Sequence, residues 1–368
     1  MRVLQVIDKS FLGGGQTVVR HLLEGFRGTD VESLLACRDG GPLVEAARAL
    51  GTRVHTIPFD KRFRPSAARR VADLVRSERV DVVHAHGLVA ATTCWMARRL
   101  FGARVPLLYH QHGFHHHNYG PLTIGLRRAA EKAICRRVDR VIPVSSADLA
   151  LLSSGGYAPR ERLELVYYGI PEPRATAEEI EGARRAARLE PGRPVVGLVG
   201  RLHVQKGVDV FLAAAALVHE ARPDAQIVVV GEGELEAELH EQGRRLGLED
   251  AVRFMGGRAS APFMPLFSVA VLSSRWEGLP LVLLEYMARS LPIVTTDAEG
   301  CLDAVGETEA RIVPRDDPRA MADAILGLLG DPVSAHRLGE SARARFDGTF
   351  DIVTMTRRFE SIYREVLR

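Results

Sequence analysis

Short apolar runs alternate with longer amphipathic stretches along the whole chain. The runs are rich in Val, Ile and Leu, and the stretches that follow carry apolar residues at helical spacing. The predicted strands are residues 3–7, 31–36, 54–57, 80–86, 105–110, 141–145 and 163–166 in the first half, and 194–199, 227–230, 253–255, 269–272, 292–297 and 310–314 in the second. Strands that alternate with helices predict parallel sheets covered on both faces, and therefore an α/β fold.

One loop between a predicted strand and a predicted helix carries two acidic residues. Residues 273–285 have the sequence SSRWEGLPLVLLE, and Pro280 suits the first helical position, where its missing N–H would be unpaired anyway. The helix N-terminus then lies at the carboxyl edge of the sheet, where free amides favour a phosphate. Because a carboxylate repels phosphate, we expect Glu277 and Glu285 to accept hydrogen bonds from hydroxyl groups on either side. This arrangement predicts a ligand with sugars flanking a diphosphate, such as a nucleotide sugar.

Two cations follow the predicted strand at 194–199. Arg201 and Lys206 stand between that strand and a predicted helix at 208–220. They would meet the same diphosphate, the arginine as a bidentate fork and the lysine as a point charge. The alternative is a structural salt bridge.

Histidines and glycines gather at the predicted strand ends of the first half. His84 and His86 lie one residue apart, so they share a face of their strand, and five more histidines lie within residues 110–117. A metal site is one interpretation, but strand-end packing and hydrogen bonding is favoured because no carboxylate or cysteine is spaced as a co-ligand. Gly13, Gly14 and Gly15 follow the first strand, where backbone amides can approach a ligand; a flexible turn is the alternative.

The run Glu277 to Glu285 resembles the Glu-x7-Glu motif of the retaining GT-B glycosyltransferases of glycosyltransferase family 4. The Gly-Arg-x4-Lys-Gly pattern around Arg201 and Lys206 and the His112-Gly113 pair match the same family, and the similarity covers nearly the whole chain. The family usually has Pro-Asn-Gly-Val where this chain has Tyr167-Tyr168-Gly169-Ile170.

The resemblance implies a GT-B fold, in which two Rossmann-like domains face each other across a cleft. We expect an acceptor-side domain at 1–172, a linker at 173–193 and a nucleotide-sugar domain at 194–351, with a terminal helix at 352–368 packing back on the first domain. The implied catalytic residues are His112, Arg201, Lys206 and Glu277. The implied donor-binding residues are Gly14, Gly15, Gly278, Leu279, Leu281 and Glu285.

The implied activity is retaining transfer of a sugar from a nucleotide diphosphate sugar to a hydroxyl of a glycan, a lipid-linked or a small-molecule acceptor. No Asp-x-Asp occurs in the sequence, so we expect no metal and no cofactor, with Arg201, Lys206 and the helix N-terminus stabilising the leaving diphosphate. A GT-B nucleotide-sugar epimerase and a non-catalytic nucleotide-sugar-binding protein are the alternatives.

Charge is distributed unevenly along the chain. Residues 1–172 hold 25 Lys and Arg against 16 Asp and Glu, while the remainder holds 24 against 30. A solvated arginine-rich surface explains this, and so does a first domain that contacts an anionic membrane or a phosphorylated acceptor; no nucleic-acid-binding module is recognisable. We expect a cytoplasmic protein, because no apolar run is long enough to span a bilayer and the N-terminus lacks a signal-peptide pattern. The basic first domain adds peripheral contact with the inner face of a membrane as an alternative to free cytoplasmic location. The four cysteines are expected to be buried thiols.

Overall fold

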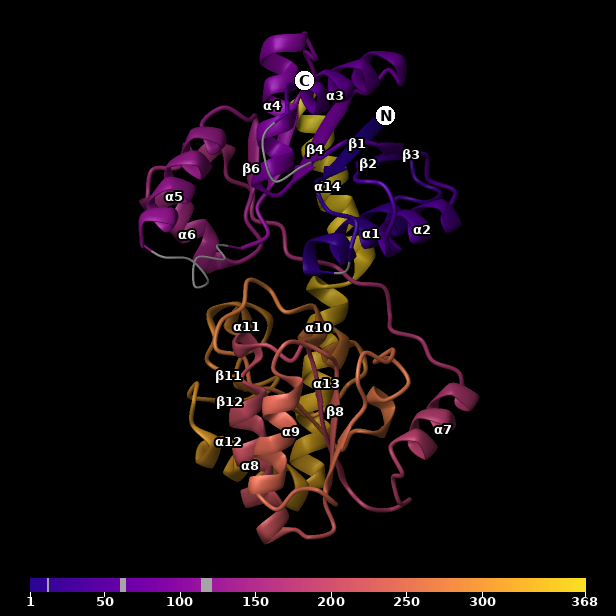
Figure 1. Ribbon diagram of the computed structural model, residues 1–368, viewed down its shortest axis with the longest axis vertical. Coiled ribbons are helices and arrows are strands. Elements are labelled where there is room, and N and C mark those ends of the chain that lie inside the picture. Colours follow the sequence, from indigo (N-terminus) through magenta and orange to yellow (C-terminus); the bar gives the residue numbers. More distant parts are fainter. Residues whose placement is uncertain (12, 60–63, 114–120) are drawn as a thin grey trace. The chain divides into compact units, whose positions relative to one another are not determined.

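Each half of the chain builds its own six-stranded, all-parallel sheet (Figure 1). The computed structural model describes residues 1–11, 13–59, 64–113 and 121–368. Unit 1 comprises Met1–Pro171 together with Asp351–Arg368, and unit 2 comprises Glu172–Phe350. The sequence-based prediction of an α/β fold with two parallel sheets is confirmed.

The sheet of unit 1 has the strand order β3-β2-β1-β4-β5-β6. Its strands are β1 (Arg2–Ile7), β2 (Glu32–Cys37), β3 (Val54–Thr56), β4 (Val82–His86), β5 (Leu107–His110) and β6 (Arg140–Ile142). The strand order reverses between β1 and β4, since the chain adds β2 and β3 on one side of β1 and β4 to β6 on the other. Open α/β sheets bind ligands at this switch point, beyond the carboxyl ends of the strands.

Helices cover both faces of this sheet because successive strand residues point to opposite sides. Leu34 and Ala36 face a core shared with α3 (Pro65–Ser77) and α4 (Leu88–Phe101), whereas Leu35 and Cys37 face α1 (Gly14–Gly25) and α2 (Pro42–Ala49). The other helices of the N-terminal part of the unit are α5 (Pro121–Cys135), α6 (Ser146–Ser154) and η1 (Arg160–Arg162).

The last helix of the chain, α14 (Ile352–Val366), belongs to unit 1 and packs beside α1. Gly25 of α1 permits this contact, because a Cβ there would lie 2.5 Å from a methyl carbon of Thr356 and 2.9 Å from Ile352. Tyr363 is fully buried, and its hydroxyl accepts a hydrogen bond from the Gln5 amide of β1 (3.3 Å).

The sheet of unit 2 has the order β12-β11-β10-β7-β8-β9. Its strands are β7 (Val195–Val199), β8 (Gln226–Val230), β9 (Val252–Phe254), β10 (Val269–Leu272), β11 (Ile293–Thr296) and β12 (Arg311–Val313). The helices are α7 (Ala177–Ala186), η2 (Val204–Lys206), α8 (Val208–Ala221), α9 (Glu236–Arg245), η3 (Met264–Leu266), α10 (Leu281–Ala288), α11 (Glu299–Ala304), α12 (Pro318–Gly330) and α13 (Pro332–Thr349). Helix α8 packs with α9 and α12, whereas α10 packs with α11 and α13.

One predicted strand, 163–166, is wrong. Leu163 forms a single parallel bridge with Val141, and the Glu164 and Val166 amides donate to the carbonyls of Val141 and Pro143. Pro143 has no amide proton to donate in return, so the ladder cannot continue there.

Candidate functional site

The acidic loop of unit 2 joins the buried strand β10 to helix α10, as the sequence pattern predicts. Pro280 is the N-cap residue of α10 and not its first helical residue, a correction to the sequence-based placement, because its carbonyl already accepts from the amides of Leu283 (3.0 Å) and Leu284 (3.4 Å). Within the described chain the amides of Leu281 and Val282 have no hydrogen-bond acceptor. These two donors point where the helix dipole favours an anion.

A second loop, residues 200–207, lies against the acidic loop because β7 is the direct neighbour of β10. Gly207 has a φ of 58°, and a Cβ there would lie 2.2 Å from the carbonyl oxygen of Ser273. The Ser273 hydroxyl donates to the Lys206 carbonyl (2.8 Å), and the Arg275 amide donates to the Gln205 carbonyl (2.8 Å). Backbone contacts therefore fix the two loops in register, so that each side chain of one loop has a defined neighbour in the other.

Lys206 and Glu277 form an ion pair at this junction. The Lys206 Nζ lies 2.5 Å from Glu277 Oε1, and the two side chains are 17% and 6% exposed. The Ser274 hydroxyl donates to the same oxygen (2.6 Å), and the Gln205 amide donates to Oε2 (3.4 Å). A carboxylate has about four acceptor positions, so Glu277 is held in place by the protein and keeps capacity for one more donor.

The other predicted residues of unit 2 lie around this pair. Arg201 is exposed, and within the described ranges no hydrogen bond or ion pair holds its guanidinium. Leu279 is buried, so its backbone is the part that a ligand can contact, whereas Leu281 is half-buried at the start of α10. Glu285 is half-buried one turn further along, where its charge opposes the lowering of the Arg289 pKa that burial causes.

Sequence reasoning missed two of the residues that hold Glu277, Ser274 and Gln205. Gln205 bridges the loops by donating to the Trp276 carbonyl (2.9 Å) as well as to Glu277. Gly300, at the start of α11, packs directly against the Gly278 backbone. A side chain at position 300 would not fit, because its Cβ would lie 2.0 Å from the Gly278 carbonyl oxygen. The signal for Gln205 was its position directly before Lys206, but its partner lies 72 residues away.

In unit 1 the histidines at the ends of β4 and β5 form a buried cluster. His84, His86 and His110 bring one ring nitrogen each to within 4.8 Å of one another, and the His84 and His110 rings are stacked with centroids 5.3 Å apart. Burial lowers the pKa of all three well below the usual histidine value, and the neighbouring histidines lower it further. The cluster is therefore neutral at neutral pH.

A chain of hydrogen bonds passes through this cluster to His112. Gln5 Oε1 lies 2.9 Å from His86 Nε2, His86 Nδ1 lies 3.0 Å from His112 Nε2, and His112 Nδ1 lies 2.7 Å from the Tyr168 hydroxyl. With Gln5 Oε1 as acceptor, His86 donates through Nε2 and accepts from His112, so His112 in turn accepts from Tyr168. Tyr168 is one of the two tyrosines that depart from the family pattern, and this contact gives it a positioning role that the sequence did not reveal.

The glycine-rich turn after β1 lies beside His112. A Cβ on Gly15 would come within 3.2 Å of the His112 ring, whereas a Cβ on Gly14 would meet open space. The structure therefore brings Gly15 and His112 together at the carboxyl edge of the unit 1 sheet and leaves Gly14 facing outward at the N-terminus of α1.

The histidine cluster has features of both the metal interpretation and the strand-end packing interpretation. Both nitrogens of His110 and Nε2 of His84 are buried without a hydrogen-bond partner among the described residues, and imidazole suits zinc. The group contains no carboxylate or thiolate to balance a cation, whereas the observed bonds of His84 to Tyr363 and of His86 to Gln5 match the strand-end packing interpretation. His115, His116 and His117 lie outside the described residues.

We expect the buried histidines to make the protein acid-sensitive. Because the folded chain keeps these rings neutral, the unfolded chain binds more protons below about pH 6.5, and stability falls as the pH decreases. Each ring contributes up to about 1.4 kcal/mol per pH unit below that value. Thermal denaturation between pH 8 and pH 5 measures this, and His110→Leu should reduce the slope since it removes one titrating group without removing a hydrogen bond. An unchanged slope in that variant would contradict the assignment.

Comparison with known proteins places the chain in a family. Residues 13–169 match the model of the glycosyl transferase 4-like domain, and residues 193–331 match that of the glycosyl transferases group 1. The chain belongs to the group 1 glycosyltransferases. It is an enzyme of that family.

The four cysteines are free and buried, as the sequence predicted.

Similar glycosyltransferases occur among characterised bacterial proteins. The chain is 29% identical to the lipopolysaccharide core biosynthesis mannosyltransferase LpsB of Rhizobium meliloti over 64% of this chain and 68% of that protein. It is also 29% identical to the alpha-D-kanosaminyltransferase of Streptomyces kanamyceticus over 77% of each chain. The crystal structure of Anabaena Alr3699/HepE in complex with UDP-glucose is 22% identical, with a TM-score of 0.85 over 99% of this chain and 100% of that one. This likeness confirms the predicted GT-B fold; the cleft between the two domains stays a prediction.

Among the described residues of this glycosyltransferase, no helix is both long enough and apolar enough to cross a membrane.

Proposed function

We propose that this glycosyltransferase transfers a hexose from a nucleotide diphosphate sugar to an acceptor hydroxyl, with the diphosphate held by unit 2. The observation that carries the proposal is the junction of the two loops of unit 2. There the free amides of Leu281 and Val282, the exposed Arg201 and the Lys206–Glu277 pair lie around the carboxyl edges of β7 and β10. Amides and cations suit a diphosphate, while a carboxylate with one open acceptor position suits a sugar hydroxyl.

The names of related proteins support the same donor class. HepE was crystallised with UDP-glucose, and the relatives described above are named for the transfer of mannosyl and kanosaminyl groups. By this proposal Glu285 holds the ribose, and the backbone of Gly278, Leu279 and Leu281 contacts the diphosphate. In unit 1 the Gly14–Gly15 turn and His112 line the region of the transferred sugar and the acceptor.

We propose further that transfer retains the anomeric configuration by front-face substitution. The leaving phosphate then helps to deprotonate the acceptor, and Lys206 and Arg201 stabilise the charge that develops on it. Analysis of the product anomer by NMR tests retention, and an inverted product would exclude it.

A thermal-shift panel of UDP-, GDP-, ADP- and dTDP-sugars tests the donor class. A ligand that binds the folded chain alone raises the melting temperature by an amount that grows with its concentration. We expect one nucleotide to raise it in a saturable way and to support transfer when an acceptor pool is added. If none of the four raises it, the proposed donor site is wrong.

Turnover is expected to be independent of metal ions. The cations that would neutralise the leaving diphosphate are protein side chains, so dialysis against EDTA should leave the transfer rate within about twofold of its starting value. Added Mn²⁺ or Zn²⁺ should not increase it. A complete loss that either ion restores would contradict the prediction and favour the histidine cluster as a metal site.

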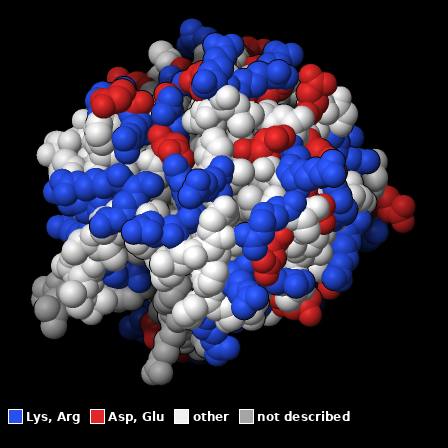
Figure 2. Space-filling model, turned by 90° about the horizontal axis from the view of Figure 1, so that it is seen from above, with Lys and Arg blue, Asp and Glu red and all other residues white. Residues whose placement is uncertain are grey.

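We propose that the acceptor hydroxyl belongs to a glycan, a lipid-linked or a small-molecule acceptor. The excess of basic residues in the first half of the chain supports a further proposal, that unit 1 makes peripheral contact with an anionic membrane surface. On the face shown in Figure 2, Lys and Arg side chains cover more of the surface than Asp and Glu, which are scattered among them.

A further inference from the structure

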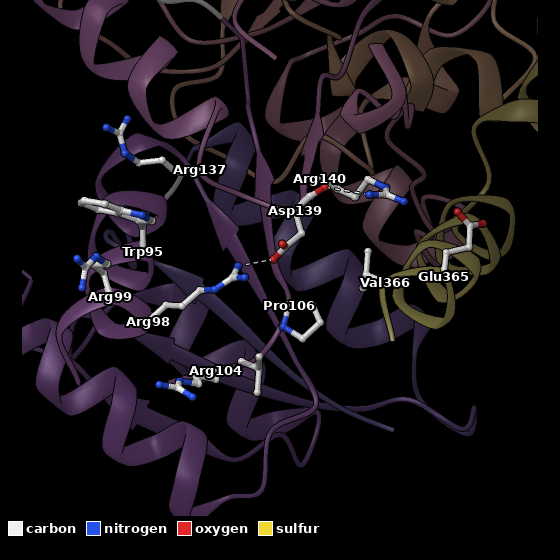
Figure 3. Close-up of a pocket in the computed structure, with 11 residues that line it drawn as sticks. Trp95, Arg98, Arg99, Arg104, Pro106, Arg137, Asp139, Arg140, Glu365 and Val366 are labelled. Carbon is white, nitrogen blue, oxygen red and sulfur yellow. Dashed lines mark hydrogen bonds and ion pairs between the residues drawn. The ribbon is translucent and has the colours of Figure 1, made fainter. Parts of the chain in front are cut away.

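Unit 1 contains a hollow of about 880 Å³ that the proposed transfer site does not use. The end of α4, the segment before β5, the segment before β6 and the last turns of α14 line it (Figure 3). We call it the arginine hollow, after Arg98, Arg99, Arg104, Arg137 and Arg140; Trp95 forms part of its wall.

The arginine hollow lies at the opposite end of the unit 1 sheet from the histidine cluster. Pro106 lines the hollow directly before β5 begins, whereas His110 is the last residue of that strand. At a rise of roughly 3.3 Å per residue, these two ends of β5 are about 13 Å apart. A ligand in the hollow is therefore separate from the region of His112 and Gly15.

Its positive charge is not neutralised by the acidic residues that line it. Five arginines stand against two carboxylates, Asp139 and Glu365. Asp139 is already engaged, since its Oδ2 accepts from Arg98 (2.6 Å) and from the Leu107 amide (2.8 Å). Glu365 accepts a hydrogen bond from the Ser361 hydroxyl (2.9 Å). It also lies 3.9 Å from Arg358, a residue that does not line the hollow.

Two of the arginines are available to a ligand. Arg99 and Arg104 are exposed, and the described structure gives their guanidinium groups no hydrogen bond and no ion pair. Arg137 is held in place, because its guanidinium stacks 5.3 Å from the Trp95 ring centre and donates to the Ala133 carbonyl (2.6 Å). Figure 3 shows Trp95 and Arg99 close together on one side of the hollow, with Arg98 reaching across to Asp139.

We propose that the arginine hollow binds the phosphate groups of a polyvalent anion. Guanidinium forks match phosphate oxygens in pairs, and several forks converging on a concave surface favour a group with more than one negative charge. The apolar lining is confined to Trp95, Val105, Pro106 and Val366, which is too little for an apolar ligand of this volume. The same chemistry is offered by a soluble diphosphate and by the head groups of anionic lipids.

Trp95 provides a direct readout of binding. The chain has two tryptophans, so Trp276→Phe leaves Trp95 as the fluorophore in the binding experiment. We expect inorganic diphosphate to change its fluorescence saturably in 0.15 M salt. Arg99→Ala with Arg104→Ala should weaken this binding at least tenfold, since hydrogen bonds from two charged donors are lost.

A matched pair of arginines controls for general charge. Arg69 and Arg70 are exposed on α3, away from the hollow lining, and their replacement by alanine removes the same charge. In the chain with both tryptophans, Arg99→Ala with Arg104→Ala should leave sugar transfer in solution unchanged, so this test is independent of the proposed function. Equal loss of diphosphate binding in the two double variants would overturn the proposal. So would the absence of binding both to diphosphate and to the anionic vesicles described next.

Vesicles distinguish the two sources of phosphate. Flotation with phosphatidylglycerol vesicles and with neutral phosphatidylcholine vesicles is compared for the same two double variants. Recovery that requires anionic lipid and is lost with Arg99 and Arg104 assigns the hollow to lipid head groups. Saturable diphosphate binding without such recovery assigns it to a soluble phosphate compound. Equal recovery with both vesicle types, together with no diphosphate response, shows that the hollow does not recognise phosphate.

Discussion

Lys206→Ala is expected to lower kcat by about 10²- to 10³-fold. Removal of a single group that stabilises charge in the transition state has an effect of roughly this size, and Glu277 holds the Lys206 ammonium in place at the loop junction. The substitution also leaves the Glu277 carboxylate, which is 6% exposed, without its counter-charge. We therefore expect a lower melting temperature as well as slower transfer, measured by steady-state kinetics and thermal denaturation.

A double variant separates these two effects. Lys206→Met combined with Glu277→Gln removes both charges of the pair, which avoids the unpaired buried carboxylate. Its melting temperature should recover most of the loss, whereas its kcat should stay at or below that of Lys206→Ala. If activity recovers together with stability, Lys206 is a structural ion-pair partner and the electrostatic role is wrong.

The two glutamates are expected to respond differently to substitution. A hydrogen bond to a charged group contributes roughly 1.5–3 kcal/mol, so Glu277→Gln and Glu285→Gln should each lower kcat/KM by about ten- to a hundredfold. Glu285→Gln should weaken both the free nucleotide diphosphate and the intact donor, because the proposed ribose contact is common to them. Glu277→Gln should leave the nucleotide diphosphate unweakened, since it releases Lys206 from its carboxylate partner.

Calorimetry with both ligands on both variants measures this difference. Asp209→Asn provides a control in the same unit, because Asp209 pairs with Arg275 and is not among the residues proposed to contact the donor. If Glu277→Gln weakens the bare nucleotide diphosphate as much as Glu285→Gln does, the placement of the sugar beside Glu277 is wrong.

The fold was predictable because its information is local. Most buried strands are short apolar runs rich in Val, Ile or Leu. The loop at 273–280 is indicated by Gly278 and Pro280, which lie between such a run and a predicted helix. The predicted strand at 163–166 failed for a reason outside its own sequence, namely that its partner segment contains Pro143.

The contacts inside the candidate sites were not predictable in the same way. The charges of Lys206 and Glu277 indicated a role for each, but their pairing depends on contact between two loops, and the two residues are 71 positions apart in the sequence. Tyr363 likewise carries no motif, and it contacts His84 across 279 positions of sequence. Such pairs follow from strand order, which local patterns do not determine.

The contribution of α14 to unit 1 has a consequence for the order in which the chain folds during synthesis. Tyr363 provides the hydroxyl that bonds Gln5 and His84, so the core of the first-made unit stays incomplete until the last residues emerge. At about 5–20 residues per second, the Glu172–Phe350 segment takes roughly ten to forty seconds to make. During that interval the face of α1 that later receives α14 is exposed on the ribosome, whereas unit 2, which is continuous in sequence, can close before it.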